Sequence, residues 1–252
     1  MISVVIPVYN GEKTVGRAVE SALLQEVEKE ILVIDDCSTD GTENVLKSFA
    51  ENPQVHYVKN ERNLGVAKTR NRGVELAKGE YVAFLDADDC WLEGKLEAQL
   101  KRLAETGDVI CSTARQLCCP GSAKDGQIIH MPERVSYRDL LGYNSIACSS
   151  VLIRTEVARE LPMDCDAVHE DYLTWLKVLK KYRTCSGIDV PYLRYSLSTS
   201  GKSGSKLHSA RMTFGVYRKA GLSLVKSCEC FVRYAFHGVW NYYGPKKRQL
   251  HR

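Results

Sequence analysis

The stretch EYVAFLDADDCW, residues 80–91, decides how the rest of the chain can be arranged. Residues 80–85 are apolar and aromatic and follow a Lys-Gly pair, which predicts a buried strand. Asp86, Asp88 and Asp89 come next, and carboxylates this close repel one another unless a cation offsets their charge. Asp86 and Asp88 face the same way if the strand continues. Mg²⁺ and Mn²⁺ prefer carboxylate oxygens, so a divalent-cation site is one interpretation, and an acidic turn that ends the strand is the other.

Strand and helix patterns alternate three times before this stretch. Short apolar runs predict strands at residues 3–7, 30–34 and 55–58, and apolar positions at helical spacing predict helices at residues 12–25, 45–49 and 65–77. This alternation predicts a parallel sheet, whose ligands bind beyond the carboxyl ends of its strands. Three polar clusters fall at such ends and are expected to converge on one rim: Pro7–Tyr9, Asp35–Asp36 and Asp86–Asp88.

Two common nucleotide-binding motifs are absent from the sequence. No G-x-G-x-x-G follows the first predicted strand, which argues against a Rossmann dinucleotide site. Gly201-Lys202-Ser203 is similar to the end of a P-loop, but Ser196 stands where the earlier glycine is required. Bound phosphates would therefore be held by a metal rather than by a glycine-rich loop.

The second half of the chain is less regular. Helices are predicted at residues 92–105, at 136–141 and from His169 onward. Strands are predicted at 108–113 and 146–153, and two short strands broken at Pro191 are predicted in 183–195. A loop or hairpin is predicted at 120–132. Glu170 and Asp171 open the helix after His169. Acids in a first helical turn interact favourably with the helix dipole, so their position alone leaves a chemical role open.

The C-terminal fifth differs in charge from the rest. Residues 202–252 hold eleven Lys and Arg but one acid, Glu229, a balance of +10, whereas the remainder has a balance of −6. Small polar residues at 196–205 predict a mobile loop, either a lid or a linker, and two helices split near Gly221 are expected after it. Aromatic residues interleaved with Arg and Lys suit an anionic membrane interface, or the aromatics pack on the domain. Nucleic acid is a poorer fit, since the overall charge is small.

Overall composition indicates a globular protein. The chain has 252 residues, 44% of them apolar and 26% charged, and no apolar run long enough to span a membrane. The N-terminus reads as a first strand rather than a signal peptide. Ten cysteines without an export signal predict reduced thiols in the cytoplasm, and their spacing does not form a paired CxxC zinc pattern.

Taken in order, the motifs resemble those of the inverting glycosyltransferases of family 2, which have the GT-A fold. The matching stretches are Val4–Asn10, Val33–Thr42, Asn63–Gly65 with Arg70-Asn71, Gly79–Tyr81 through Asp86–Asp89, and Glu170–Tyr172 with Trp175. The resemblance implies an α/β, Rossmann-like domain with a mostly parallel central sheet flanked by helices. That domain would span residues 1–195, divided into a nucleotide-binding half (1–91) and an acceptor half (92–195), followed by a flexible loop (196–206) and a basic, aromatic helical extension (207–252).

The resemblance also implies roles for the donor-side residues. Pro7, Tyr9 and Asp36 would line the nucleotide-base pocket, where the Asp36 carboxylate could accept a hydrogen bond from uracil N3. Arg70 could approach the nucleotide, although a surface arginine is an equally good interpretation. Asp86 would reach the ribose or the metal, and Asp88 would bind the Mn²⁺ or Mg²⁺ that bridges the diphosphate.

On the acceptor side, Asp171 would be the general base and Glu170 is the alternative. Many relatives carry a basic or aromatic motif at about residues 195–206. Here only Ser, Gly and Lys occur there, so Lys202 and Lys206 are weak candidates for phosphate contact and the acceptor stays open.

The function expected from this resemblance is metal-dependent transfer of a hexose from a UDP-sugar to a glycan hydroxyl, forming a β-linkage. The acceptor would be a lipid-diphosphate-linked sugar of bacterial surface polysaccharide, such as O-antigen, and the enzyme would be cytoplasmic or peripheral at the inner face of the membrane. Two alternatives stay open. A sugar-nucleotide nucleotidyltransferase needs a glycine-rich basic loop that residues 8–15 do not supply. A non-catalytic UDP-sugar-binding module would bind UDP without transfer.

Overall fold

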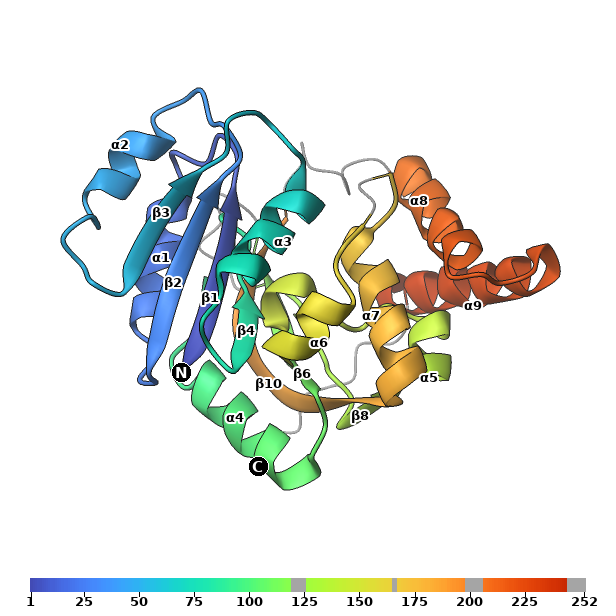
Figure 1. Cartoon of the computed structure of the whole chain (residues 1–252). Helices are drawn as coiled ribbons and strands as arrows, with labels where there is room; N and C mark the ends of the chain where they lie inside the picture. Colours follow the sequence, from blue (N-terminus) through green and yellow to red (C-terminus); the bar gives the residue numbers. More distant parts are fainter. Residues whose placement is uncertain (119–125, 165–166, 198–205, 244–252) are drawn as a thin grey trace.

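A computed structural model of the chain describes residues 1–118, 126–164, 167–197 and 206–243 (Figure 1). The strands are β1 (Ile2–Val8), β2 (Lys29–Asp35), β3 (Val55–Lys59), β4 (Tyr81–Phe84), β5 (Cys90–Trp91), β6 (Ile110–Cys118), β7 (Ile128–Ile129), β8 (Arg134–Ser136), β9 (Leu152–Arg154) and β10 (Thr184–Ser196). The helices are α1 (Val15–Leu23), α2 (Thr42–Lys47), α3 (Val66–Leu76), α4 (Lys95–Thr106), α5 (Tyr137–Gly142), the 3₁₀ helix η1 (Cys148–Ser150), α6 (Thr155–Glu160), α7 (Glu170–Tyr182), α8 (Lys206–Lys219) and α9 (Leu224–Tyr243).

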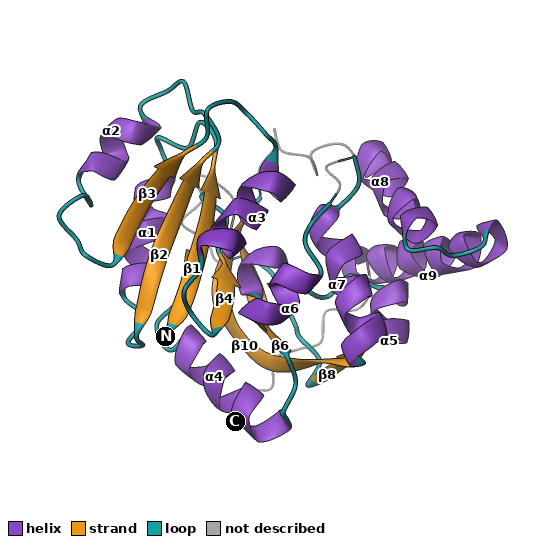
Figure 2. Ribbon diagram, viewed as in Figure 1, coloured by secondary structure: helices purple, strands orange, loops and turns teal. Residues whose placement is uncertain are grey.

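The strands form one mixed sheet, flanked by helices (Figure 2). Its order among the described residues is β3-β2-β1-β4-β9-β6-β10-β5, with β7 paired to β6 and β8 to β10. β1, β2, β3 and β4 run parallel, as their alternation with helices predicts. β9 runs antiparallel to both β4 and β6, while β10 is parallel to β6. The mostly parallel α/β sheet expected from the sequence is therefore confirmed.

Both faces of the central strands are covered by helices. All seven residues of β1 are buried, and they alternate between two cores. Val4 and Ile6 pack with α1 and α4, whereas Val5 packs with α3 on the opposite face. Gly73 lets α3 approach closely, since a Cβ there would lie 2.3 Å from a methyl carbon of Val5. This packing holds α3 beside β1, so that residues on α3 can reach the ends of β1 and β4.

Two expectations for the second half were wrong. The predicted strand at 146–153 is split into η1 and β9, because Ser150 turns the backbone by bonding back to Ala147 O through both its N–H (3.0 Å) and its Oγ (2.7 Å). The two strands expected in 183–195 are one strand, β10, whose register shifts between Ile188 and Leu193. Pro191 lies in this irregular stretch, where its missing N–H breaks no ladder bond.

Other predicted elements agree with the structure in outline. β7 pairs antiparallel with β6, which agrees with the hairpin expected at 120–132, and residues 119–125 of that prediction lie outside the described chain. Ser136 caps α5 by accepting from Asp139 N, as its position before an apolar run suggests. The helix α6 and the short strands β5 and β8 were not predicted.

The C-terminal helices lie at the side of the molecule away from β3 (Figure 1). α8 packs on α7, and α9 packs on α5 and α8. They divide at Gly221, which has a positive φ of 85° and donates its N–H to Arg218 O. The predicted split is confirmed. Within the described part of the chain, no helix has both the length and the apolar character needed to cross a bilayer.

Candidate active site

A cavity of about 800 Å³ opens at the carboxyl ends of β1 and β4. Its walls come from the β1–α1 loop, α3, the turn after β4, η1, the start of α7, and α8 and α9. Residues far apart in the chain thus meet at one rim, which parallel strands with helical crossovers make possible. The cavity contains most of the candidate residues chosen from sequence: Pro7, Tyr9, Arg70, Asp86, Asp88, Glu170 and Asp171.

The acidic turn after β4 is held in place by its neighbours. β4 ends at Phe84, close to the predicted end of the strand, so Asp86 and Asp88 lie in a turn and the case in which the strand continues through them does not apply. Asp86 N donates to Ser149 Oγ (3.0 Å), and Asp89 N donates to Asp86 O (3.0 Å), which closes the turn. Ser196, at the end of β10, donates from its Oγ to Asp88 O (2.6 Å) and from its N to Asp89 Oδ1 (2.8 Å). The elements η1 and β10 therefore fix the position of this turn. These are the two elements that differ most from the predictions made from sequence.

Asp89 differs from the other two carboxylates. Its side chain is buried beneath the turn, and burial together with the charge of Asp86 raises its pKa well above the usual range. Asp86 and Asp88 instead line the cavity. The structure therefore separates a carboxylate that supports the turn from two that face the open space.

Arg70 connects the acidic turn to α7. Its Nη2 lies 2.5 Å from Asp86 Oδ1, and its Nη1 lies 2.8 Å from Glu170 Oε1. The Arg70 side chain is only 5% exposed, so the surface-arginine interpretation does not hold. Its nearness to a nucleotide stays a prediction, since both terminal nitrogens already bind carboxylates. The visible role of Arg70 is to hold the turn after β4 against the start of α7.

The two acids at the start of α7 have different surroundings. Glu170 is buried and bound to Arg70. Asp171 lines the cavity, and its Oδ1 accepts the N–H of Tyr172 at 2.7 Å. Burial and the neighbouring charge of Glu170 raise the pKa of Asp171. A carboxylate that holds a proton more strongly than usual is suited to take one from a hydroxyl.

A smaller cavity of about 300 Å³ adjoins the larger one at the end of β1, where Tyr9 lines both. Asp36 forms part of its wall. Asp36 Oδ1 accepts from Asn60 Nδ2 and Leu64 N, both at 2.8 Å, and Oδ2 accepts from Gly65 N at 2.9 Å. Asp36 thus holds the turn that precedes α3, and Oδ2 keeps capacity for a further donor.

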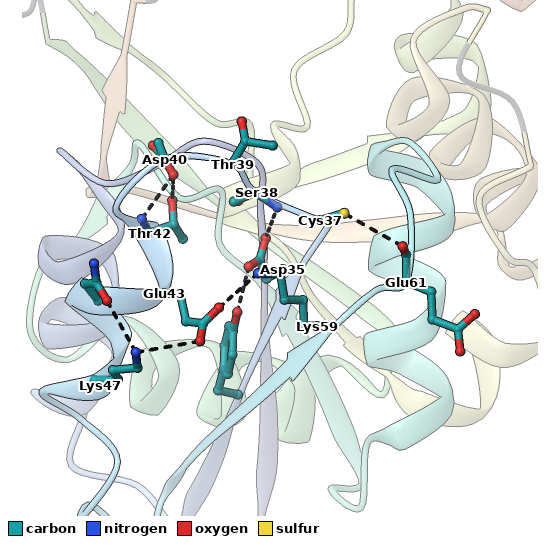
Figure 3. Close-up of polar contacts among 12 residues, drawn as sticks. Asp35, Cys37, Ser38, Thr39, Asp40, Thr42, Glu43, Lys47, Lys59 and Glu61 are labelled. Carbon is teal, nitrogen blue, oxygen red and sulfur yellow. Dashed lines mark hydrogen bonds and ion pairs between the residues drawn. The ribbon is translucent and has the colours of Figure 1, made fainter.

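The stretch after β2 contains residues whose supporting role was not foreseen (Figure 3). Asp35, at the end of β2, accepts from Ser38 N (2.8 Å) and from the hydroxyl of Tyr57 (2.7 Å). Asp40 accepts from the backbone N of Thr42 at 3.0 Å. These bonds fold the stretch into a compact turn of the kind that Asp, Ser and Thr stabilise.

That turn supports the loop carrying Tyr9. Gly11 N donates to Thr42 Oγ1 (2.8 Å), and Asn10 N donates to Ser38 Oγ (2.9 Å). Asn10 has a positive φ of 53°, a conformation that Asn adopts more readily than most residues. Tyr9 itself is 51% exposed and lines both cavities. The run of Ser, Thr and Asp residues after β2 is the sequence feature from which this support of the Tyr9 loop could have been predicted.

The family model "Glycosyl transferase family 2" matches residues 3–158. The chain belongs to this family. It is 36% identical over 242 residues to TuaG of Bacillus subtilis, named for teichuronic acid biosynthesis, covering 95% of this chain and 96% of TuaG. It is 30% identical over 241 residues to the Escherichia coli UDP-Glc:alpha-D-GlcNAc-diphosphoundecaprenol beta-1,3-glucosyltransferase WfaP, covering 95% of this chain and 94% of WfaP.

Solved structures share the GT-A fold of this glycosyltransferase. TarS of S. aureus, crystallised with UDP-GlcNAc, superposes with a TM-score of 0.71 at 18% identity, covering 98% of this chain and 77% of that one. The mannosyltransferase PcManGT of Pyrobaculum calidifontis, solved with GDP-Man and Mn²⁺, gives a TM-score of 0.68 at 19% identity, covering 96% of this chain and 71% of that one. One structure with this fold therefore contains Mn²⁺.

The acidic turn of the glycosyltransferase suits a divalent cation. Asp88 is partly buried, and its pKa is raised first by this burial and then by the charge of Asp86. Two ionised carboxylates beside the cavity therefore repel each other, and a bound cation would offset this electrostatic cost. Arg70 takes up one oxygen of Asp86 and leaves Oδ2 for another partner. Within the described residues, no three His, Cys, Asp or Glu side chains form a complete metal site. A donor set of two carboxylates matches a cation whose other ligands are phosphate oxygens and water.

The remaining candidates lie at or beyond the edge of the described chain. Lys202 and most of the loop expected at 196–205 fall outside the described residues, and Lys206 begins α8 with its side chain undescribed. Arg115 and Tyr195, which sequence reasoning did not select, line the cavity wall from β6 and β10. The Arg115 guanidinium lies 5.8 Å from the Tyr195 ring centroid, and its Nη1 donates to the backbone O of residue 145 at 3.0 Å.

Replacing Arg70 with methionine should lower the free energy of unfolding by about 3–5 kcal/mol, since it leaves Asp86 and Glu170 without their buried cation. The matched control is Arg154→Met, which breaks the ion pair between Arg154 and Glu80, whose side chains are 36% and 62% exposed. That loss should be about 0–1 kcal/mol. Urea denaturation of both variants measures the difference. Equal losses would show that Arg70 does not carry the connection between β4 and α7.

Proposed function

We propose that this glycosyltransferase transfers a hexose, with inversion, from a UDP-sugar to a hydroxyl of a lipid-diphosphate-linked sugar, and that the reaction needs Mn²⁺ or Mg²⁺. The observation that carries the proposal is the composition of one cavity. It holds a carboxylate pair suited to a cation, Asp86 and Asp88, and a carboxylate with a raised pKa, Asp171. Transfer from a nucleotide diphosphate to a hydroxyl needs a site for the leaving diphosphate and a base for the hydroxyl proton.

The proposal places the donor across the two cavities. The uracil enters the smaller cavity, where Pro7 and Tyr9 form its walls and Asp36 Oδ2 accepts the N3 hydrogen. The sugar and diphosphate extend into the larger cavity toward Asp86 and Asp88. A cation bound there would neutralise charge on the departing UDP.

Asp171 then acts on the acceptor. Its carboxylate takes the proton of the acceptor hydroxyl while that oxygen attacks the anomeric carbon. The new carbon–oxygen bond forms as the bond to the UDP oxygen breaks, and the electron pair leaves with UDP. Attack opposite to the leaving group turns an α-linked donor into a β-linked product. Glu170 is the weaker candidate for this base, because its carboxylate binds Arg70.

The relatives support the proposed acceptor. WfaP is named for a lipid-linked diphosphate-sugar acceptor and a beta-1,3 product, and TuaG for teichuronic acid biosynthesis. We extend the acceptor class and the β-linkage to this chain, and place its work in bacterial surface polysaccharide synthesis. An enzyme with such an acceptor would work at the cytoplasmic face of the membrane, peripherally bound. The division into a nucleotide-binding half, an acceptor half and a helical extension is part of the same proposal.

The deciding experiment is a donor screen. The purified chain is incubated with Mn²⁺, a panel of UDP-hexoses and a GlcNAc-diphospho-lipid, and released UDP is measured. We expect acceptor-dependent UDP release with one or a few donors, and a β-linked product by NMR. Pyrophosphate release from UTP and a sugar phosphate would instead indicate a nucleotidyltransferase. UDP binding by calorimetry without turnover on any acceptor would indicate a binding module.

Replacing Tyr9 with alanine should raise the dissociation constant for UDP roughly tenfold, because stacking of a base on an aromatic ring contributes about 1–3 kcal/mol. Tyr9 is half-exposed beside the smaller cavity, so its removal should leave the fold intact. Leu24→Ala is the control, since Leu24 is 57% exposed and lies outside the cavity walls. Calorimetric titration with UDP measures both. An unchanged dissociation constant for UDP in the Tyr9 variant would show that the uracil ring binds elsewhere.

A further inference from the structure

The outward surface of α9 is unusually apolar. Leu224, Val225, Val232 and Phe236 are 60%, 80%, 67% and 64% exposed. Among the described residues, no other large apolar side chain reaches these values. Val225, Val232 and Phe236 are spaced by seven and four residues, so they lie along one side of the helix, with the exposed Cys228 between them. We call Val225, Cys228, Val232 and Phe236 the α9 stripe.

The stripe is not the side of α9 that packs on the protein. That side carries Ser227 and Cys230, which are 0% and 1% exposed, and Phe231, whose ring meets Phe214 of α8 edge-on at 5.9 Å. Tyr234 on this side lines the reaction cavity. α9 thus has two apolar sides, and the fold buries one of them and leaves the stripe largely exposed.

The structure changes which residues can face a membrane. The sequence suggested the aromatic residues of the extension, yet Tyr217 is fully buried and donates to Leu141 O (3.0 Å). Phe214 and Phe231 contact each other, and Tyr234 faces the cavity. These four aromatics pack on the domain, as the second of the two interpretations has it, whereas Phe236 is exposed and belongs to the α9 stripe. The side chains of residues 237–243 lie outside the described part of the structure.

Basic residues run beside the stripe. Lys226 and Arg233 each follow a stripe residue by one position and are seven apart, so they leave the helix along one edge of the stripe, and the Arg233 guanidinium also reaches toward Gly142 of α5. Glu229, the one acid of residues 202–252, is held by Lys226 at 2.8 Å. An apolar stripe with a basic border is the arrangement by which a helix lies in the interface of an anionic bilayer.

We infer that the α9 stripe docks this glycosyltransferase on the surface of a bilayer with anionic headgroups. A second copy of the chain is the poorer occupant, because a symmetric contact through α9 would bring together two α8–α9 helix pairs, each with six Lys and Arg residues against one acid. The inward side of the same helix pair forms cavity wall, with Tyr234 from α9 and Ser209 and Thr213 from α8. Docking through α9 therefore holds the reaction cavity beside the membrane, which serves catalysis if the acceptor is lipid-linked, as proposed above.

The test uses the full chain and a triple variant, Val225→Ser, Val232→Ser and Phe236→Ser. The control triple variant is Leu24→Ser, Leu76→Ser and Val190→Ser, whose native side chains are also exposed, at 57%, 43% and 45%. Flotation is measured with vesicles of phosphatidylglycerol and phosphatidylethanolamine, and with phosphatidylcholine alone. Circular dichroism checks that each variant is folded.

We expect the native chain and the control to float with the anionic vesicles and to float less at high salt. The stripe variant should lose at least about tenfold in membrane affinity, since binding follows buried apolar area. Flotation of the folded stripe variant equal to that of the native chain overturns the inference. A native dimer that becomes monomeric in the stripe variant, with vesicle binding unchanged, assigns the stripe to a second copy instead.

Activity separates this inference from the proposed function. The stripe variant should keep the native rate on a short-chain, water-soluble acceptor and lose about tenfold on a long-chain acceptor embedded in vesicles, in step with its membrane affinity. If the native chain floats but transfers no sugar to any acceptor, the proposed function fails and the docking surface stands. If it transfers sugar but does not float, the docking surface fails and the function stands.

Discussion

Replacing Asp88 with asparagine should lower kcat/KM for sugar transfer by roughly a thousandfold, because stabilisation of the leaving diphosphate by a cation amounts to several kcal/mol and each ~1.4 kcal/mol is tenfold in rate. Asp88 lines the cavity, and Ser196 binds its backbone O, an interaction that the substitution keeps. The change therefore removes a negative charge from the site without removing that support of the turn. We expect UDP affinity in the presence of Mn²⁺ to fall to the value measured without it.

Calorimetric titration of UDP with and without Mn²⁺ measures this loss separately from catalysis. Asp164→Asn is the control, because Asp164 is 55% exposed and pairs with Lys177 on the surface. A second comparison uses Asp89→Asn. Asp89 is buried below the turn and accepts from Ser196 N, so its replacement should mainly lower stability. Mn²⁺-dependent UDP binding that survives in Asp88→Asn but disappears in Asp89→Asn would mean that the cation is held on the other side of the turn.

The N-terminal half of the fold could be predicted from sequence for a physical reason. Its central strands are buried on both faces and therefore read as short continuous apolar runs, separated by helices with regular apolar spacing. Parallel order then brings the segment ends at Pro7, Asp36 and Asp86 to one rim with no further information. The rim residues were identified because they interrupt these apolar runs.

What sequence could not supply were contacts between distant polar residues. The bonds from Arg70 to Asp86 and Glu170 join residues 16 and 100 positions apart, and no local pattern distinguishes Arg70 from an exposed arginine. The buried serines of residues 145–150 look like part of an apolar strand until their hydrogen bonds are known. The aromatics of α8 and α9 were equally ambiguous, because periodicity reports that a helix has an apolar side but not what covers it.

Replacing Asp171 with asparagine should lower kcat by about 10²–10⁴-fold, the range that a general base contributes, while UDP binding stays close to native. Asp171 accepts the N–H of Tyr172 through Oδ1, and the amide oxygen of asparagine can accept the same bond. The helix start should therefore survive the change. The comparison variant is Glu170→Gln, which leaves the Asp171 carboxylate in place and should retain turnover, although it weakens the pair with Arg70. Full activity in Asp171→Asn together with its loss in Glu170→Gln would reassign the base.

The pH profile supplies an independent check on the same residue. A base works only when deprotonated. We therefore expect kcat/KM to increase as the pH rises through the pKa of Asp171, and to be low at pH values below that pKa. Burial and the charge of Glu170 raise that pKa against the opposing charges of Arg70 and His169, which moves the acidic limb of the profile above the position expected for an ordinary aspartate. Glu170→Gln removes the charge of Glu170, which is one of the two causes that raise the pKa of Asp171. The acidic limb of the profile should therefore shift to lower pH in that variant. A limb that stays in place when Glu170 is neutralised would show that another group sets the profile.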